Sequence, residues 1–464
     1  MARQYLSDID TAMLQLEDPT NLMMITGVMV FESPIDFHRL RDTLQVRLLG
    51  MRRFQQRLAW PVQGLGNPHW EDDPDFDLDY HVQRAKLPPP GDHSALQDVV
   101  SLLASTPLDQ TRPLWQFHLI EGYAECCAAI LRIHHTIGDG MALLHVILSL
   151  TDTDPDAPWP VEQPEGSARH GGDRRAKSIS TWRKGAKLVS TGFELFGDPA
   201  RRHELARTGK EAAGDLGRFL LLRPDPKTVL HGELCERKRA AWSEGVPLEE
   251  IKTIRRALGG TVNDVMLTVV AGALRRYMQD RGEPVDYITI RATIPVNVRP
   301  AGKEVQLGNH VGAVFVTLPV SIADPACRLG EIVRRTSSRK DSNEALAFYV
   351  GLRALGRTPS AIANRLIRTF SNRATAVMTN VRGPEERLYL AGSPVEALLP
   401  WAPTTGRMGL AVSILSYAGQ VRLGILADEG LVPDPKEIIA AFHDEHEALL
   451  ARAQMAEKQV SKED

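Results

Sequence analysis

One stretch of the chain combines residue types that can move a proton. It reads Ile133-His134-His135-Thr136-Ile137-Gly138-Asp139-Gly140 and holds two histidines, one aspartate and two glycines within seven positions. An imidazole titrates near neutral pH, so a histidine that faces a cleft is a natural general base. The glycines allow the backbone to turn tightly. This stretch therefore predicts acid–base chemistry centred on a histidine.

The two histidines end an apolar run over 128–134 that has the length of a strand. Side chains alternate along a strand, so one histidine is expected to face a cleft while the other is held in packing. Two roles remain open for Asp139: it orients the histidine, or it braces the turn by pairing with a distant arginine. The competing interpretations are a pair of core histidines and a metal site of His134, His135 and Asp139. Adjacent strand histidines do not easily face one ion, so we expect no metal.

Strand and helix patterns alternate on both sides of this stretch. The spacing predicts strands over 25–31, 115–120, 128–134, 287–296, 311–318, 374–381, 409–415 and 420–427, and helices over 36–49, 140–150, 248–258 and 262–277. The residues Ser416-Tyr417-Ala418-Gly419 between the last two strands are typical of a hairpin. The sequence thus predicts a mixed α/β chain with two halves, 1–150 and 246–464, joined by a linker over 151–245.

Composition narrows the kinds of protein that the chain can be. Hydrophobic residues make up 43% and charged residues 24% of 464 positions, which excludes wholesale disorder. A net charge of −3 makes a nucleic-acid partner unexpected. Four cysteines without a Cys-x-x-Cys pair predict neither a disulfide framework nor a zinc ribbon, which favours the cytoplasm. No signal-peptide core or membrane span is evident, so we expect any membrane contact to be peripheral.

The middle of the predicted linker is basic. Residues 169–210 contain eleven Lys or Arg against four Asp or Glu, with Trp182 and Phe193 among the apolar residues between them. A basic amphipathic helix with aromatic side chains suits an anionic lipid surface. A solvated helix packed across both halves explains the same charges. Both interpretations stay open at this point.

The histidine stretch also matches the HHxxxDG signature of the CoA-dependent acyltransferase superfamily. Within it, the chain resembles the bacterial wax ester synthase/diacylglycerol acyltransferases over nearly its whole length. Short segments carry the resemblance by their shared order: Leu6–Asp10, Pro113-Leu114-Trp115, Asn263–Met266, Pro295–Arg299, Leu307-Gly308-Asn309, Thr379–Pro384 and the 416–419 hairpin. One departure is Arg382, where many members carry proline.

This resemblance implies two halves like chloramphenicol acetyltransferase, with a channel between them. It implies that His135 removes the proton of an acceptor alcohol, whose oxygen attacks the thioester carbonyl of acyl-CoA directly. No acyl-enzyme and no cofactor are then expected, and acyl-CoA is a substrate. The implied acceptor is a fatty alcohol or diacylglycerol, both long and apolar. The implied location is cytoplasmic, with peripheral attachment to the inner membrane or to lipid inclusions.

The resemblance also implies roles for single residues. Asn263 is the expected oxyanion donor beside His135, His134 and Asp139, whereas Asp264 either belongs to the site or caps its helix. Asp139 is expected to pair with Arg299. The residues expected to support the site are Gly138, Gly140, Arg299, Asp264, Pro113, Leu114 and Trp115. The residues expected in a channel or substrate loop are Asn309, Asn380 and Gly383.

Two other functions fit the same motif. One is a condensation-type acyltransferase that takes its acyl group from a carrier-protein thioester. The other is a non-catalytic lipid-binding protein of the same fold, which would be expected to have lost His135 or Asp139. A metal-dependent hydrolase is a third and less favoured interpretation. Use of free acyl-CoA as the donor separates the first of these from the family function.

Overall fold

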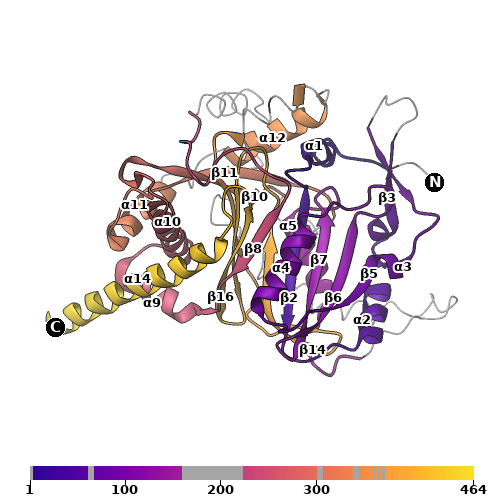
Figure 1. Ribbon diagram of the computed structural model, residues 1–464, viewed down its shortest axis with the longest axis horizontal. Coiled ribbons are helices and arrows are strands. Elements are labelled where there is room, and N and C mark those ends of the chain that lie inside the picture. Colours follow the sequence, from indigo (N-terminus) through magenta and orange to yellow (C-terminus); the bar gives the residue numbers. More distant parts are fainter. Residues whose placement is uncertain are drawn as a thin grey trace.

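The structure is a computed structural model, shown in Figure 1. It describes residues 4–60, 67–158, 223–299, 307–337, 344–358, 362–363, 366 and 371–463. The basic segment 169–210 and most of the predicted linker lie outside these residues. The interpretation of that segment as a lipid-binding helix is therefore not addressed by the fold.

The first sheet contains the strand that leads into the histidine stretch. It has six strands in the order β13-β14-β2-β7-β6-β5, antiparallel except for the parallel pair β5–β6. Their bounds are β2 Met24–Phe31, β5 Val82–Lys86, β6 Trp115–Tyr123, β7 Cys126–His134, β13 Tyr389–Leu390 and β14 Ser393–Trp401. The apolar side chains of both faces are buried, so this sheet is covered on each side.

The second sheet lies beside the first and belongs to the later part of the chain. It has seven strands in the order β11-β10-β12-β15-β16-β8, with β9 also paired to β16. The pairs β10–β12 and β12–β15 are parallel and the others antiparallel. Their bounds are β8 Lys238–Trp242, β9 Val246–Pro247, β10 Ile290–Asn297, β11 Val311–Leu318, β12 Ala376–Arg382, β15 Leu410–Tyr417 and β16 Gln420–Asp428.

Helices pack against both sheets, and α4 also contacts β8 of the second sheet. In the first part of the chain they are α1 Asp8–Leu16, α2 Phe37–Thr43, α3 Leu78–His81, α4 His93–Ala104 and α5 Gly140–Leu150, and in the later part α9 Leu248–Leu258, α10 Val262–Asp280, α11 Pro325–Ser337, α12 Glu344–Gly356 and α14 Pro435–Glu463. Helices α9, α10, α11 and α14 share one core with the second sheet, and they lie on its left side in Figure 1. Helix α12 packs on α1 and β11, which joins the two parts near the N-terminus.

The remaining elements are short. A small sheet has the order β1-β4-β3, with β1 Gln4–Tyr5, β3 Gln56–Ala59 and β4 His69–Asp72. The predicted helix over 36–49 is divided, because α2 passes into a π-helical turn at Leu44–Leu48, and a 3₁₀ turn follows at Arg52–Gln55. A 3₁₀ turn at Val285–Tyr287 delays the predicted strand over 287–296 until β10. These local turns are set by packing, which periodicity does not report.

The hairpin predicted at 416–419 is confirmed. Strands β15 and β16 pair up to Tyr417 and Gln420, so the loop has two residues. Ala418 has φ 47° and Gly419 has φ 79°, as a type I′ turn requires. The helices predicted over 140–150 and 248–258 are also confirmed as α5 and α9.

The strands are not divided between the sheets as the predicted domain boundaries imply. Strands β13 and β14 belong to the predicted half 246–464, yet they extend the sheet of the first half. Strand β8 lies within the predicted linker, yet it forms an edge of the second sheet. The apolar pattern of a strand says that it is buried but not which sheet it joins, so this exchange is decided by tertiary packing.

A membrane-crossing helix is absent from the part of the chain that the structure describes. No single helix there combines sufficient length with sufficient apolar character. Helices α9 and α10 reach both only when they are taken together, and they meet at a bend of 98°.

Candidate active site

The two adjacent histidines have opposite surroundings at the end of β7. His134 Nδ1 lies 2.8 Å from Thr136 Oγ1, and its Nε2 hydrogen-bonds the Glu17 carboxylate. The backbone N–H of His135 donates to Met23 O at 2.7 Å, and its imidazole lines a cavity between the sheets. His134 is thus held in packing while His135 faces the cavity, as strand alternation predicts.

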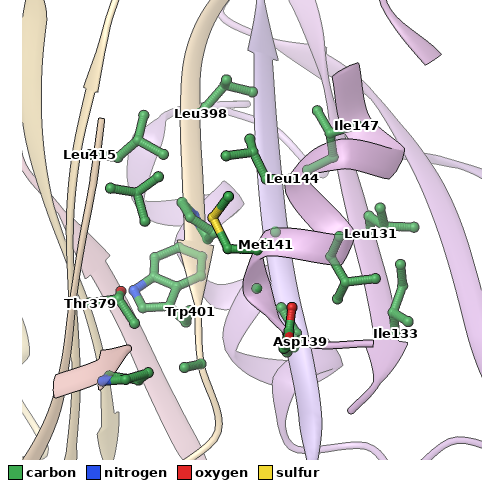
Figure 2. Close-up of a pocket in the computed structure, with 18 of the residues that line it drawn as sticks. Leu131, Ile133, Asp139, Met141, Leu144, Ile147, Thr379, Leu398, Trp401 and Leu415 are labelled. Carbon is green, nitrogen blue, oxygen red and sulfur yellow. The ribbon is translucent and has the colours of Figure 1, made fainter. Parts of the chain in front are cut away.

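The cavity beside His135 is almost entirely apolar. Its volume is about 120 Å³, and its polar lining side chains are those of His135, Asp139, Asn297 and Thr379. Figure 2 shows Leu131, Ile133, Leu144 and Ile147 on the side of β7 and α5, facing Thr379, Trp401 and Leu415 from the strands opposite. The apolar lining suits an aliphatic chain.

On the side of the ring that carries Nδ1, His135 is held by a series of side-chain hydrogen bonds. Its Nδ1 lies 2.8 Å from Asn309 Oδ1. The Asn309 Nδ2 group donates to Asp10 Oδ1 and to His135 O, each at 2.7 Å. The other ring nitrogen, Nε2, has no hydrogen-bond partner among the described residues. Only 8% of the His135 surface is exposed, and this burial lowers the pKa of its imidazole, against the opposing influence of Asp139.

Asp139 braces the turn after β7. Its carboxylate accepts hydrogen bonds from the Ala142 N–H at 3.0 Å, which caps α5, and from the His310 N–H at 2.8 Å. It also forms a buried ion pair with Arg299, with Nη1–Oδ2 at 2.8 Å. Arg299 Nη2 in turn donates to Gly308 O at 2.7 Å. Of the two roles open from the sequence, the contacts favour bracing.

The glycines on either side of Asp139 serve different needs. A Cβ on Gly138 would lie 3.0 Å from the Cβ of Ala142, so the close approach of the turn to α5 requires a small residue. A Cβ on Gly140 would meet nothing within 4 Å, and Gly140 lines the cavity. Gly138 therefore permits packing, and Gly140 leaves space beside the histidine.

Asn263, the expected oxyanion donor, is not among the residues that line the cavity beside His135. Asn263 is buried at the start of α10, where its Oδ1 accepts a hydrogen bond from Asn380 Nδ2 at 2.6 Å. Neither residue lines the cavity that contains His135. Thr379 and Val381 of β12 do line it, so alternation directs Asn380 to the other face of the strand.

Asp264 caps its own helix. Its Oδ2 accepts from the Thr261 N–H at 2.9 Å, and its N–H donates to Thr261 Oγ1 at 3.1 Å, which is a capping box. Its other oxygen accepts from Thr336 Oγ1 at 2.8 Å. Every contact of Asp264 is therefore structural.

Pro113, Leu114 and Trp115 support β7 from the neighbouring strand. Leu114 O accepts the His134 N–H at 3.0 Å. Trp115 is fully buried, donates from Nε1 to Phe54 O at 2.8 Å and stacks on the His81 ring at 4.6 Å between centroids. This segment fixes the end of the strand that carries the histidines.

The three residues predicted for a channel or substrate loop lie outside the wall of the apolar cavity. Asn309 instead lines a second, polar cavity on the other side of the histidine turn, and Asn380 bonds Asn263. Gly383 donates its N–H to Ser416 O at 2.8 Å, and a Cβ there would lie 2.6 Å from that oxygen. Gly383 thus allows two loops to pack, and the neighbouring Arg382 pairs with Glu385 at the surface.

Several residues contribute to the site although nothing at their positions in the sequence predicts it. Asp10 lies in a segment that the resemblance used, but only the fold brings it to Asn309. Gly27 and Trp401 line the cavity from β2 and β14, and no motif marks them. Within the described ranges, no three His, Cys, Asp or Glu side chains gather into a possible metal site.

Known proteins match the chain over almost its full length. Residues 6–266 match the wax ester synthase/diacylglycerol acyltransferase catalytic domain, and residues 307–449 match the WS/DGAT C-terminal domain. A probable diacylglycerol O-acyltransferase of Mycobacterium tuberculosis is 30% identical over 463 residues, with 96% of each chain covered. A putative one from Mycobacterium bovis has the same identity and coverage.

Solved structures show the same fold. The wax ester synthase/diacylglycerol acyltransferase from Marinobacter aquaeolei aligns with a TM-score of 0.70 at 23% identity, over 97% of this chain and 100% of that one. The first condensation domain of the calcium-dependent antibiotic synthetase aligns with a TM-score of 0.61 at 15% identity, over 97% and 96%. The expected fold of two acetyltransferase-like halves is thereby confirmed.

Proposed function

The chain belongs to the wax ester synthase/diacylglycerol acyltransferase family and is an acyltransferase, and on that premise we propose its substrates and its catalytic base. It transfers a long acyl chain from acyl-CoA to the hydroxyl group of a fatty alcohol or a diacylglycerol. His135 is the general base. The observation that carries this proposal is the position of His135 in the wall of an apolar cavity.

The reaction proceeds by direct transfer. His135 Nε2 accepts the proton of the hydroxyl group as its oxygen bonds to the thioester carbonyl carbon. The tetrahedral intermediate collapses, the carbon–sulfur bond breaks, and the departing sulfur of CoA takes the proton from the imidazolium. A base must be unprotonated to start this cycle, and burial, which lowers the pKa of His135, keeps it neutral near pH 7.

Cysteine chemistry is not needed for this route. Cys126 and Cys127 lie at the first residues of β7, and His135 follows its last residue, so a nine-residue strand separates them. Such a strand is about 30 Å long. Burial raises the pKa of the Cys127 thiol to about 11, so it is protonated near neutral pH and a poor nucleophile.

The apolar lining supports a long hydrocarbon as one of the two substrates. Each methylene group that leaves water for such a cavity contributes about 0.8 kcal/mol. Substrates of this kind reside in membranes and lipid inclusions, so we propose that the protein works in the cytoplasm, attached peripherally to such a surface. Sedimentation with anionic vesicles tests this attachment, and protein that stays in the supernatant speaks against it.

Release of CoA from palmitoyl-CoA tests the proposed reaction. Hexadecanol, a diacylglycerol and no acceptor are compared in parallel. Release that depends on an acceptor supports transfer, and the preferred acceptor identifies the product. Release without any acceptor indicates a thioesterase, and no release favours a carrier-protein donor or a binding protein.

The role of His135 is tested with His135→Gln. We expect the rate to fall about 10²- to 10⁴-fold, since this is what a general base contributes. His38→Gln on the exposed face of α2 is the matched control and should keep the wild-type rate. If folded His135→Gln protein retains more than a few per cent of activity, His135 is not the base.

A further inference from the structure

The contacts behind His135 define where its proton lies. Asn309 is 3% exposed, and both groups that its Nδ2 contacts, Asp10 Oδ1 and the backbone oxygen of His135, accept hydrogen bonds but do not donate them. The amide nitrogen of Asn309 must therefore face these two oxygens. Its Oδ1 is then the atom that faces His135 Nδ1 at 2.8 Å.

An amide oxygen only accepts hydrogen bonds, so His135 Nδ1 must carry a hydrogen to make this contact. A neutral imidazole carries a hydrogen on one ring nitrogen, and the other nitrogen has a lone pair that can accept a proton. With the hydrogen held on Nδ1, the lone pair is on Nε2. This is the protonation form that a base at the cavity needs.

We propose that Asn309, oriented by Asp10, is a positioning residue that fixes His135 in its Nδ1–H form. This inference rests on the proposed role of His135 as the base. It gives the N-terminal segment of the chain a part in catalysis, because Asp10 belongs to α1 and reaches the histidine only through Asn309.

The carboxylate of Asp10 is well placed to orient the amide. It is buried, and its second oxygen accepts a hydrogen bond from Ser7 Oγ at 2.7 Å. Ser7 also caps α1 by accepting from the Asp10 N–H at 3.1 Å, so the helix start and the carboxylate are held together. Arg53, which lies over the Trp70 ring at 4.0 Å, lines the same polar cavity as Asp10.

The guanidinium group of Arg53 shares this cavity with Asp10. Burial lowers the pKa of Arg53 to about 10, and the nearby Asp10 opposes that shift. A carboxylate can only accept, whereas an amide at this position has both an acceptor and a donor side and orients Asn309 less strictly.

Nuclear magnetic resonance of protein labelled with ¹⁵N in histidine tests the protonation form directly. Two-bond ¹H–¹⁵N correlations at pH 8 distinguish the Nδ1–H from the Nε2–H form, and the signals absent from His135→Gln identify His135. We expect the wild-type protein to show Nδ1–H. Wild-type signals of the Nε2–H form overturn the proposal without any further variant.

Two variants separate positioning from simple structural support. Asn309→Leu keeps the volume but removes the amide, and we expect His135 to shift toward Nε2–H. Its kcat should fall about 10- to 100-fold, part of what a general base supplies, while KM for acyl-CoA changes less than twofold. Asp10→Asn keeps an oxygen that can accept from Asn309 but adds a donor, so we expect kcat to fall by less than in Asn309→Leu; a wild-type kcat refutes the role of Asp10.

The possible results are distinguishable. A folded Asn309→Leu protein that retains the Nδ1–H form or the wild-type kcat refutes the role of Asn309. A rise in KM alone assigns Asn309 to substrate binding and also refutes it. Activity in His135→Gln contradicts the proposed function instead, and the wild-type spectrum still reports the protonation form of His135 in that case.

Discussion

His134 and His135 differ by one position in the chain, yet the fold gives them unrelated tasks. His134 is enclosed by Thr136 and Glu17, whereas His135 has Asn309 behind it and an apolar cavity before it. The difference comes from the strand, which turns consecutive side chains to opposite sides. At the scale of the residue, reactivity is decided by what lies on each side of a ring.

The surroundings of His135 predict the pH dependence of the reaction. Burial lowers the pKa of His135, and Asp139, which forms an ion pair with Arg299, opposes this shift; the other titratable groups around the ring are His134 and, behind Asn309, Asp10. Since the free base is active, kcat/KM should stay high as pH falls to 6.5 and decline only below that value. A pH profile of kcat/KM for acyl-CoA checks this, and a decline centred above pH 6.5 contradicts it.

The ion pair between Asp139 and Arg299 predicts a loss of stability when one partner is removed. Both side chains are nearly inaccessible, so Arg299→Ala leaves a buried carboxylate without its cation and should cost about 3–5 kcal/mol. The exposed pair of Arg382 with Glu385 is the control, and Arg382→Ala should cost less than about 1 kcal/mol. Urea unfolding of both variants measures these values, and equal losses would argue against the bracing role.

At the scale of the element, strand β2 has a glycine, Gly27, where its backbone lines the cavity. Gly27 pairs with Leu131 of β7 and Pro400 of β14, so it sits in the middle of the sheet. A Cβ at this position would meet nothing within 4 Å, and no turn requires glycine there. A central strand normally favours larger side chains, so the space at Gly27 is better explained by a substrate than by packing.

We therefore expect Gly27→Leu to shorten the hydrocarbon that the enzyme accepts, while Gly27→Ala has a small effect. Acyl-CoA of 8 to 16 carbons is tested with one alcohol, and alcohols of the same lengths with one acyl-CoA. The series whose preference shifts to shorter chains identifies which substrate occupies the cavity. Gly330→Leu, at an open and exposed position on α11, is the control; unchanged preferences in both series for Gly27→Leu would remove the cavity from substrate binding.

At the scale of the whole molecule, β14 connects the two sheets. It pairs with β2 over most of its length, although β12, which precedes the β13–β14 hairpin, and β15, which follows it, belong to the second sheet. Its last residue, Trp401, is fully buried and lies against Gly424 of β16, where a Cβ would be 2.8 Å from Nε1. One strand therefore contacts both sheets and lines the cavity between them.

This arrangement predicts that the two sheets unfold together. Trp401→Ala should cost about 3–5 kcal/mol, as expected for removal of a fully buried aromatic side chain. Trp60→Ala, at a position that is 59% exposed, should have little effect. Urea unfolding followed by both tryptophan fluorescence and far-UV circular dichroism should give one coincident transition, and two separated midpoints would show that the halves are independent.

The sequence alone determined the features that depend on neighbours in the chain. The apolar runs that became β7, α5, α9 and the β15–β16 hairpin are local, because periodicity and turn chemistry act over a few residues. The opposite directions of His134 and His135 and the capping role open to Asp264 follow from the same local rules. The family follows from the order of short motifs along the chain.

Only the tertiary structure decided the contacts between distant residues. Asp10, Asn309 and His135 are separated by up to 299 positions, and Asn263 accepts a hydrogen bond from Asn380, which lies 117 positions away. Likewise, no local sequence pattern predicts that β14 joins the first sheet or that space remains beside Gly27. Side-chain periodicity indicates that a residue is buried, but many different partners can bury it. Which partner it meets depends on how the two sheets pack together in the closely packed interior.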